Sequence, residues 1–218
     1  MIDHTRHIGI FNASELNVCL IGAGGIGAIT AITLGKMGVN TIYLYDDDFV
    51  DDINLATQYH RVSDVGLRKV RTVYNSVYEF SRTNLVPLPQ RVKPDSKLPV
   101  ADIYISAVDS IASRQDIWRA LRKLDPEHGW YIDARMGAEV YEHYIVKLED
   151  YHWYQMSLAA QDDNDFPDLP CTSKATIYTA NIAAGHIGAA IRRILTGKQK
   201  PGFLTHGIFN NTISFLDI

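Results

Sequence analysis

Four glycines near the start of the chain have the spacing needed to hold a phosphate group. Gly22, Gly24 and Gly27, with Gly25 among them, form a G-x-G-x-x-G run directly after the apolar residues 18–21. Such a run makes a tight turn from a buried strand into a helix. Its second glycine lets the backbone approach a phosphate because no Cβ intervenes. The first N–H groups of the helix then face the anion, so the run predicts a nucleotide-binding turn.

An acidic cluster follows at the distance that such a site requires. Asp46, Asp47 and Asp48 lie nineteen residues and more beyond Gly27, where the predicted strand 41–46 ends. A carboxylate at this place in a nucleotide-binding sheet binds the ribose hydroxyls. We therefore expect Asp46 to be the ribose ligand and Asp48 to lie beside it. The motif indicates an adenine nucleotide without deciding which one.

More polar residues follow predicted strands, where open α/β sheets bind their ligands. They are Asn54 and Gln58 in the short helical turn 51–58, Arg68 and Lys69 early in the next helix, and Asp109 after the strand 103–108. Cations suit phosphate, and a single carboxylate with phosphate oxygens suits magnesium. Together these residue types would serve a nucleoside triphosphate. The alternative is a purely structural role: Asn54 and Gln58 could be turn and capping residues, and Asp109 could cap the next helix.

The hydrophobic pattern alternates between strand and helix. It predicts parallel strands at 17–21, 41–46, 85–88, 103–108 and 131–134, with helices at 25–37, 65–80 (capped by Asp64) and 111–124. It then predicts an antiparallel strand at 140–148 extended by 151–157, a loop at 159–173, a helix at 176–195 rich in small residues, and a hairpin of 202–210 with 212–216. We therefore expect an α/β protein with a Rossmann-like open sheet, parallel in its N-terminal half and mixed or antiparallel in its C-terminal half.

Composition limits the remaining choices. The 218 residues suit one domain, with a nucleotide-binding half at about 17–135 and a mixed β half at about 136–218. A net charge of −4 without a basic run disfavours nucleic acid as a partner. The two cysteines form no C-x-x-C pair, so no zinc is expected. The first residues do not resemble a signal peptide, and no apolar run reaches the roughly 20 residues of a membrane span. We expect a soluble, cytoplasmic protein.

Four motifs in order make a family resemblance specific. They are G-A-G-G-I-G, then L-Y-D-D-D followed by N-L-A-T-Q, then D-V-G-L-R-K-V, then S-A-V-D with an arginine five residues later. The chain resembles the adenylation domain of the ubiquitin-activating superfamily, including ThiF-type and molybdopterin-synthase adenylyltransferases. The resemblance implies a homodimer that uses ATP and Mg²⁺. It also implies activation of the C-terminal carboxylate of a ubiquitin-like or sulfur-carrier protein ending in Gly-Gly, with release of pyrophosphate.

The resemblance also assigns roles to residues. It implies that Asp46 holds the ribose, that Gly22–Gly27 hold the phosphates, and that Asn54 and Gln58 line the pocket. It further implies that Lys69 neutralises phosphate charge and that Asp109 binds magnesium. Arg6, in R-H-I-G, resembles an N-terminal arginine that reaches the ATP of the partner subunit.

The chain departs from the family in two places. Thr57 stands where the family has an arginine, and Arg61 or Arg68 are possible substitutes. Cys171, in P-C-T-S-K, lies where some members keep a cysteine for a thioester or sulfur relay, although it is equally an inert thiol. Arg114 is a candidate structural partner for an acid. Two other functions stay open: an NAD-dependent oxidoreductase with the same glycine fingerprint, and a catalytically silent dimeric homologue.

Overall fold

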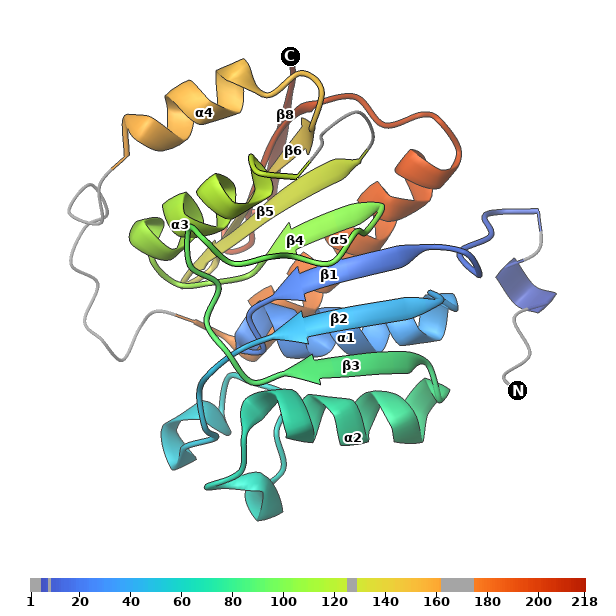
Figure 1. The fold of residues 1–218 in the computed structure, drawn as a ribbon, viewed down its shortest axis with the longest axis vertical. Coiled ribbons are helices and arrows are strands. Elements are labelled where there is room, and N and C mark those ends of the chain that lie inside the picture. The colour runs from blue at the N-terminus through green and yellow to red at the C-terminus, as the bar shows by residue number, and fades with distance from the viewer. Residues whose placement is uncertain (1–4, 8, 125–128, 162–174) are drawn as a thin grey trace.

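Eight strands form one sheet in the order β3-β2-β1-β4-β5-β6-β7-β8 (Figure 1). The parallel strands are β1 (Asn17–Ile21), β2 (Thr41–Tyr45), β3 (Asn84–Leu88), β4 (Ile103–Ser106) and β5 (Trp130–Gly137). The antiparallel strands are β6 (Val140–Lys147), β7 (Gly202–Gly207) and β8 (Thr212–Asp217). This computed structural model describes residues 5–7, 9–124, 129–161 and 175–218. The predicted Rossmann-like fold with an antiparallel C-terminal half is confirmed.

Helices cover both faces of the sheet. The helices α1 (Gly25–Met37), α2 (Lys69–Ser81) and α5 (Ile177–Leu195) pack on one face, and α3 (Ile111–Leu121) and α4 (His152–Ala159) pack on the other. Short 3₁₀ turns lie at η1 (Thr5–His7), η2 (Asp52–Asn54) and η3 (Val62–Asp64). Because successive strand residues point to opposite faces, each buried strand supplies side chains to both layers.

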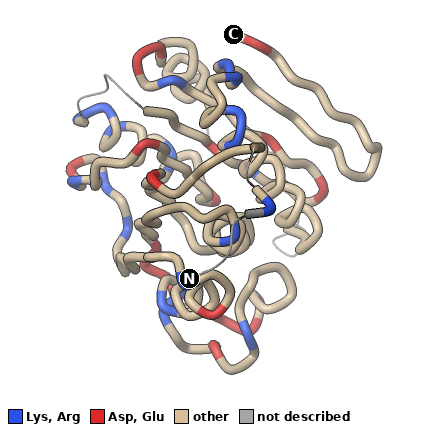
Figure 2. The backbone as a smooth tube through the Cα atoms, turned by 90° about the vertical axis from the view of Figure 1, so that its right-hand side faces the viewer, with Lys and Arg blue, Asp and Glu red and all other residues tan. Residues whose placement is uncertain are grey.

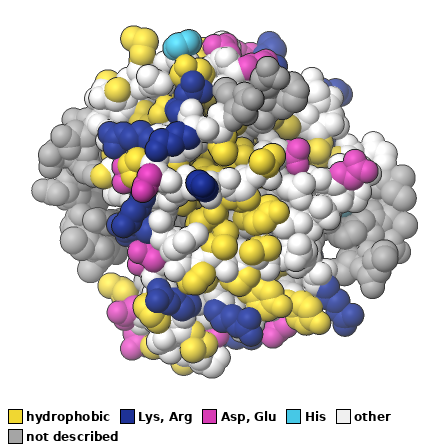
Figure 3. All heavy atoms as spheres, viewed as in Figure 1, with side chains coloured by type: hydrophobic (Ala, Val, Ile, Leu, Met, Phe, Trp, Pro, Cys, Tyr) yellow, Lys and Arg dark blue, Asp and Glu magenta, His cyan; other side chains and the backbone are white. Residues whose placement is uncertain are grey.

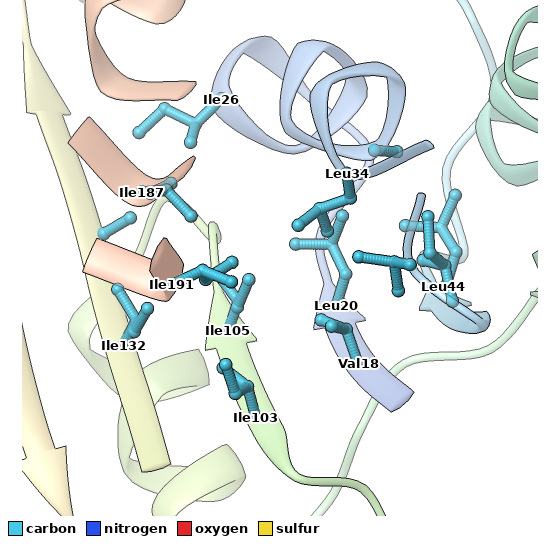
Figure 4. Close-up of a cluster of buried hydrophobic side chains, with 14 of the residues drawn as sticks. Val18, Leu20, Ile26, Leu34, Leu44, Ile103, Ile105, Ile132, Ile187 and Ile191 are labelled. Atoms are coloured by element: carbon cyan, nitrogen blue, oxygen red, sulfur yellow. The ribbon is translucent and has the colours of Figure 1, made fainter. Parts of the chain in front are cut away.

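The larger core lies between the sheet and the helices α1 and α5. Leu20 of β1 and Ile105 of β4 face Leu34 of α1 and Ile187 of α5, and all four are fully buried (Figure 4). The small residues of α5 allow close helix packing, as predicted. A Cβ on Gly188 would lie 3.3 Å from the Met37 sulfur of α1. This packing fixes α1, and therefore the loop that begins it, against the sheet.

The outer surface is mixed in character. Acidic and basic residues alternate over much of the described backbone, and the β7–β8 hairpin runs along the outside of the molecule (Figure 2). All six residues of β8 are exposed. On the face seen in Figure 3, apolar side chains gather at the centre, with Lys and Arg around them.

Two predicted elements are wrong. The helix expected at 65–80 begins at Lys69, because Gly66 has a φ of +83° and Asp64 closes a separate 3₁₀ turn. Residues 151–157 do not extend a strand, because Tyr151 is the N-cap of α4 and residues 152–157 belong to that helix. Tyr154 and Leu158, four residues apart, lie on the buried side of α4, and this helical spacing outweighs the strand preference of the aromatic residues.

Candidate functional site

The loops after β1, β2 and β4 begin at the same level of the sheet. Ile21, the last residue of β1, is in register with Tyr45 of β2 on one side and Ser106 of β4 on the other. The chain leaves β1 toward β2 and later returns to β4, so the strand order reverses between β1 and β4. Ligands of open α/β sheets bind at such a switch point, beyond the carboxyl ends of the strands.

The glycines of the loop after β1 serve two purposes. Gly22 has a φ of +106°, and a Cβ there would lie 2.5 Å from the Ala107 carbonyl oxygen. A Cβ on Gly27 would lie 1.9 Å from the Gly22 carbonyl oxygen. These two glycines are needed for the turn itself, because real Cβ atoms do not approach backbone so closely.

Gly24 and Gly25 are less tightly enclosed by backbone. A Cβ on Gly24 would lie 3.8 Å from the Gln58 amide nitrogen, which is ordinary contact. A Cβ on Gly25 would lie 3.1 Å from the Met136 methyl carbon and 3.3 Å from the Thr57 carbonyl oxygen. The missing side chains thus leave backbone exposed beneath Gln58, as a phosphate-binding loop requires.

Asp46 and Lys69 meet at the end of β2. One oxygen of Asp46 accepts the Ala23 N–H at 2.7 Å, and the other accepts the Asp48 N–H at 2.8 Å. Burial raises the pKa of Asp46, although these N–H donors and Lys69 oppose the shift. The Lys69 side chain is only 9% exposed, and its ammonium lies 2.9 Å from the Asp48 carboxylate. The structure therefore brings the three residues together beside the glycine loop.

The segment after β2 places its two predicted residues differently. The Asn54 side-chain oxygen accepts the Asp51 N–H at 3.0 Å, so Asn54 has a capping role. Gln58 lies over Gly24, and its side-chain oxygen is buried without a hydrogen-bond partner among the described residues. A buried, unpaired amide oxygen costs free energy unless a ligand or water meets it. Gln58 is therefore the better placed of the two to contact a ligand.

Asp109 follows β4 with its carboxylate unengaged. Its side chain is exposed, and within the described ranges it makes no hydrogen bond or ion pair. Ser110, and not Asp109, caps α3, because its hydroxyl accepts the Ser113 N–H at 3.2 Å. The capping alternative for Asp109 is therefore excluded.

The possible substitutes for the family arginine at Thr57 are both engaged. Arg61 pairs with Glu79 on the outer side of α2. Arg68 donates to the Asp47 carbonyl oxygen at 2.6 Å, and its guanidinium lies 4.1 Å from the centre of the Phe49 ring. Arg68 thus lies next to the acidic cluster, whereas Arg61 turns away from it.

Two predicted residues are not part of this assembly. Arg6 is exposed in η1, which lies beyond the amino ends of the strands, opposite the candidate site (Figure 1). Cys171 lies outside the described residues. Cys19, the other cysteine, is fully buried in β1, where burial raises the pKa of its thiol.

The acidic cluster itself has the spacing of a cation site. One carboxylate oxygen from each of Asp46, Asp47 and Asp48 lies within 4.8 Å of the others. The hydrogen bonds of Asp46 and the ion pair of Asp48 with Lys69 already account for this arrangement. Asp109 is not part of the cluster.

A buried polar network behind Asp109 was not predicted. Asp133 of β5 is fully buried between Arg114 of α3 and Arg135 of β5. Burial alone would raise the pKa of Asp133, but the two guanidinium groups lower it to about 2. Arg114 is confirmed as the partner of an acid. The available signal was an acid, Asp133, inside a predicted buried strand, with Arg135 directly after that strand.

The fold and the site define a Rossmann-like α/β protein with a candidate nucleotide site at the switch point. The chain belongs to the ThiF family, whose model matches residues 7–217. It is 35% identical over 102 residues to the Mycobacterium tuberculosis protein named probable adenylyltransferase/sulfurtransferase MoeZ. That match covers 44% of this chain and 26% of MoeZ, so the matched segment spans about a quarter of this relative.

Solved structures share the fold. PaaA superposes with a TM-score of 0.73 at 18% identity, over 95% of this chain and 65% of PaaA. Escherichia coli MccB, in a structure with ATP, gives a TM-score of 0.71 at 16% identity, over 94% of this chain and 64% of MccB. None of the described helices is long and apolar enough to span a bilayer.

Proposed function

We propose that this chain is an ATP-dependent adenylyltransferase that activates the C-terminal carboxylate of a ubiquitin-like or sulfur-carrier protein. One observation carries the proposal. The glycine loop after β1 lies between the end of β2, where Asp46 accepts the Ala23 N–H, and the loop after β4, which carries Asp109. Family membership supports this proposal, as do the similarity to the probable adenylyltransferase/sulfurtransferase MoeZ and the MccB structure with ATP.

The residues fit a nucleoside triphosphate. Space that a Cβ on Gly24 would partly fill lies beneath Gln58, whose buried oxygen lacks a partner in the described part of the chain. Asp46 would bind the ribose with Asp48 beside it, and Asn54 and Gln58 would line the pocket. The N–H groups of the loop Gly22–Gly27, together with Lys69, would bind phosphate oxygens.

The residues also fit magnesium. Asp109 offers one carboxylate that no other described residue engages, and Mg²⁺ is commonly bound by one or two carboxylates together with substrate phosphates. When bound, the ion would neutralise charge on the phosphates. Asp109 would be its ligand from this chain. The spacing of the cysteines gives no reason to expect zinc.

In this reaction the protein mainly positions the substrate carboxylate and the ATP phosphates. A carboxylate oxygen of the substrate attacks the α-phosphorus of ATP, the bond between the α-phosphorus and its bridging oxygen breaks, and pyrophosphate leaves. The attacking group is already ionised at neutral pH, so no general base is needed. Lys69 and the loop N–H groups lower the barrier by neutralising negative charge on the phosphates.

Three further roles belong to the same proposal. Arg6 would reach the nucleotide of the partner subunit in a homodimer, since η1 lies far from the site of its own chain. Cys171 would accept the activated group as a thioester or take part in sulfur transfer. We place the protein in the cytoplasm, as the resemblance to carrier-activating enzymes favours.

Carrier-dependent exchange of radiolabelled pyrophosphate into ATP tests the proposal. The probe is a ubiquitin-like carrier ending in Gly-Gly, compared with the same carrier lacking the last glycine. Exchange that needs the intact carrier supports adenylation. Tight NAD binding without ATP binding would support the oxidoreductase instead. A Cys171→Ala variant should keep exchange and lose any later transfer.

A second candidate is a catalytically silent dimeric homologue. Thr57 favours it, because the family arginine is missing and both possible substitutes are engaged with other groups. This function predicts dimer formation and nucleotide binding without pyrophosphate exchange. A Thr57→Arg variant would then gain exchange activity.

A further inference from the structure

The loop between β4 and α3, residues 107–110, is held against the glycine loop on one side. The Ala107 N–H donates to the Ile21 carbonyl oxygen at 2.8 Å. The Ala107 carbonyl oxygen lies so close to Gly22 that a Cβ there would approach it to 2.5 Å. The first half of this loop therefore cannot move independently of the phosphate-binding turn.

Arg114 holds the same loop on its other side. Its guanidinium donates to the Val108 carbonyl oxygen, to the Asp133 carboxylate and, at 3.1 Å, to the Ala134 carbonyl oxygen. The Arg114 side chain is 5% exposed and the Asp133 side chain is fully buried. One side chain thus joins the end of β4 to β5.

The anchor on β5 is itself well fixed. Asp133 also accepts hydrogen bonds from the Ser106 hydroxyl at 2.6 Å and the Tyr154 hydroxyl at 2.9 Å. A buried carboxylate with this many donors has little freedom to rotate. Arg114 consequently has one defined position.

Asp109 lies between two fixed neighbours. The carbonyl of Val108 is bound by Arg114, and Ser110 is bound as the cap of α3. The Asp109 carboxylate alone stays exposed, without a partner in the described ranges. A fixed backbone that carries an unengaged carboxylate is the arrangement of a preorganised ligand.

We propose that Arg114 is a positioning residue for Asp109. By joining Val108 to Asp133, it fixes Asp109 relative to the glycine loop, and so aligns the metal ligand with the phosphate-binding turn. This inference rests on the proposed function, since it takes Asp109 as the magnesium ligand. Lysine cannot replace arginine here, because only the planar guanidinium fork reaches several acceptors at once.

Calorimetric titration with AMPCPP, in magnesium and in EDTA, measures the effect without any carrier protein. In Arg114→Lys, the tightening of AMPCPP binding by magnesium should fall about 10-fold, as expected for loss of a residue that orients a metal ligand. The Kd in EDTA should change less than about twofold, because the glycine loop keeps its own contacts. The control is Arg119→Lys, at an exposed pair with Asp116 on the same helix.

A double-mutant cycle separates positioning from folding. In an Asp109→Asn background, Arg114→Lys should have no further effect on the magnesium dependence, because the ligand it positions is gone. A lower thermal midpoint with unchanged magnesium dependence would overturn the inference and leave Arg114 a purely structural residue.

If Arg114→Lys does not fold, a second variant tests the same inference. Asp133→Asn keeps the shape of the anchor but removes its charge, and it should reduce the magnesium dependence in the same direction. No reduction in that variant would also overturn the inference. Failure of the wild-type chain to bind AMPCPP would instead refute the proposed function.

Discussion

The carboxylate of Asp46 accepts the backbone N–H of Ala23 at 2.7 Å, and so ties the end of β2 to the glycine loop of β1. The residue that the sequence assigns to a ribose therefore also shapes the turn assigned to the phosphates. The glycine loop and Asp46 therefore depend on each other structurally. Substitutions that affect nucleotide binding and folding to different extents can distinguish their roles.

Two glycines of the loop give matched substitutions. Gly24→Ala adds a methyl group that meets only ordinary contacts at 3.8 Å, so the protein should fold with stability reduced by about 1 kcal/mol at most. The methyl group occupies phosphate space, so AMPCPP affinity should fall at least about 10-fold. Calorimetric titration and thermal unfolding measure the two effects.

Gly27→Ala is the control, since its Cβ would lie 1.9 Å from a carbonyl oxygen. It should lower the thermal midpoint strongly. Equal AMPCPP affinity in Gly24→Ala and wild type would show that the glycine loop does not bind the phosphates.

Asp46→Asn should change both ribose binding and stability, and the two effects can be measured separately. Burial raises the pKa of Asp46, so its ionised form is disfavoured in the folded state, and any stability it contributes is present at low pH and lost as pH rises through the folded-state pKa. Asparagine offers one acceptor oxygen in place of two, so one of the two backbone N–H groups, of Ala23 and Asp48, loses its partner, and the free energy of unfolding at pH 7 should fall by about 1–3 kcal/mol. Loss of the charged acceptor should weaken AMPCPP binding about 10-fold. Unchanged binding would show that Asp46 only shapes the turn.

Stability should fall in mild acid because of His143. Burial, then His186 and Arg193, lower the pKa of His143 to about 3, and its ring accepts or donates a bond of 2.9 Å with the Tyr141 hydroxyl. A histidine with a depressed pKa stabilises the fold above its unfolded pKa near 6.5, and this contribution is lost as pH falls toward 3. The slope should reach up to about 1.4 kcal/mol per pH unit.

Urea unfolding of wild type and His143→Gln between pH 7 and 4 tests this expectation. The variant should be less stable at pH 7 and show the shallower slope. The control is His152→Asn, at an exposed histidine. Parallel slopes for wild type and His143→Gln would contradict the assignment.

Local patterns predicted what is local in the structure. The glycine turn, the strand that begins at Thr41 and the helix that follows the glycines all depend on residues close in sequence. The network of Asp133 with Arg114 and Arg135 depends on the pairing of β4 with β5 and on the side of the sheet that α3 covers. No spacing in the sequence encodes that pairing.

In the candidate site, too, local features were predictable and contacts that depend on tertiary folding were not. Gln58 over Gly24 and Lys69 beside Asp48 depend on how the segment after β2 folds back, which its turn residues do not determine. The start of α2 differs from the prediction because Gly66, with a φ of +83°, and the 3₁₀ turn at Asp64 precede it. Asp109 follows β4, as predicted, because the pattern of a buried parallel strand is local in the sequence.

The most direct test is a crystal structure of this chain with AMPCPP and Mn²⁺, in which anomalous scattering locates the metal in place of magnesium. The account predicts phosphate density over Gly22–Gly27, a ribose at Asp46 and a manganese peak bonded to the Asp109 carboxylate. An analogue bound elsewhere, or a metal held by other residues with Asp109 still unengaged, would contradict it.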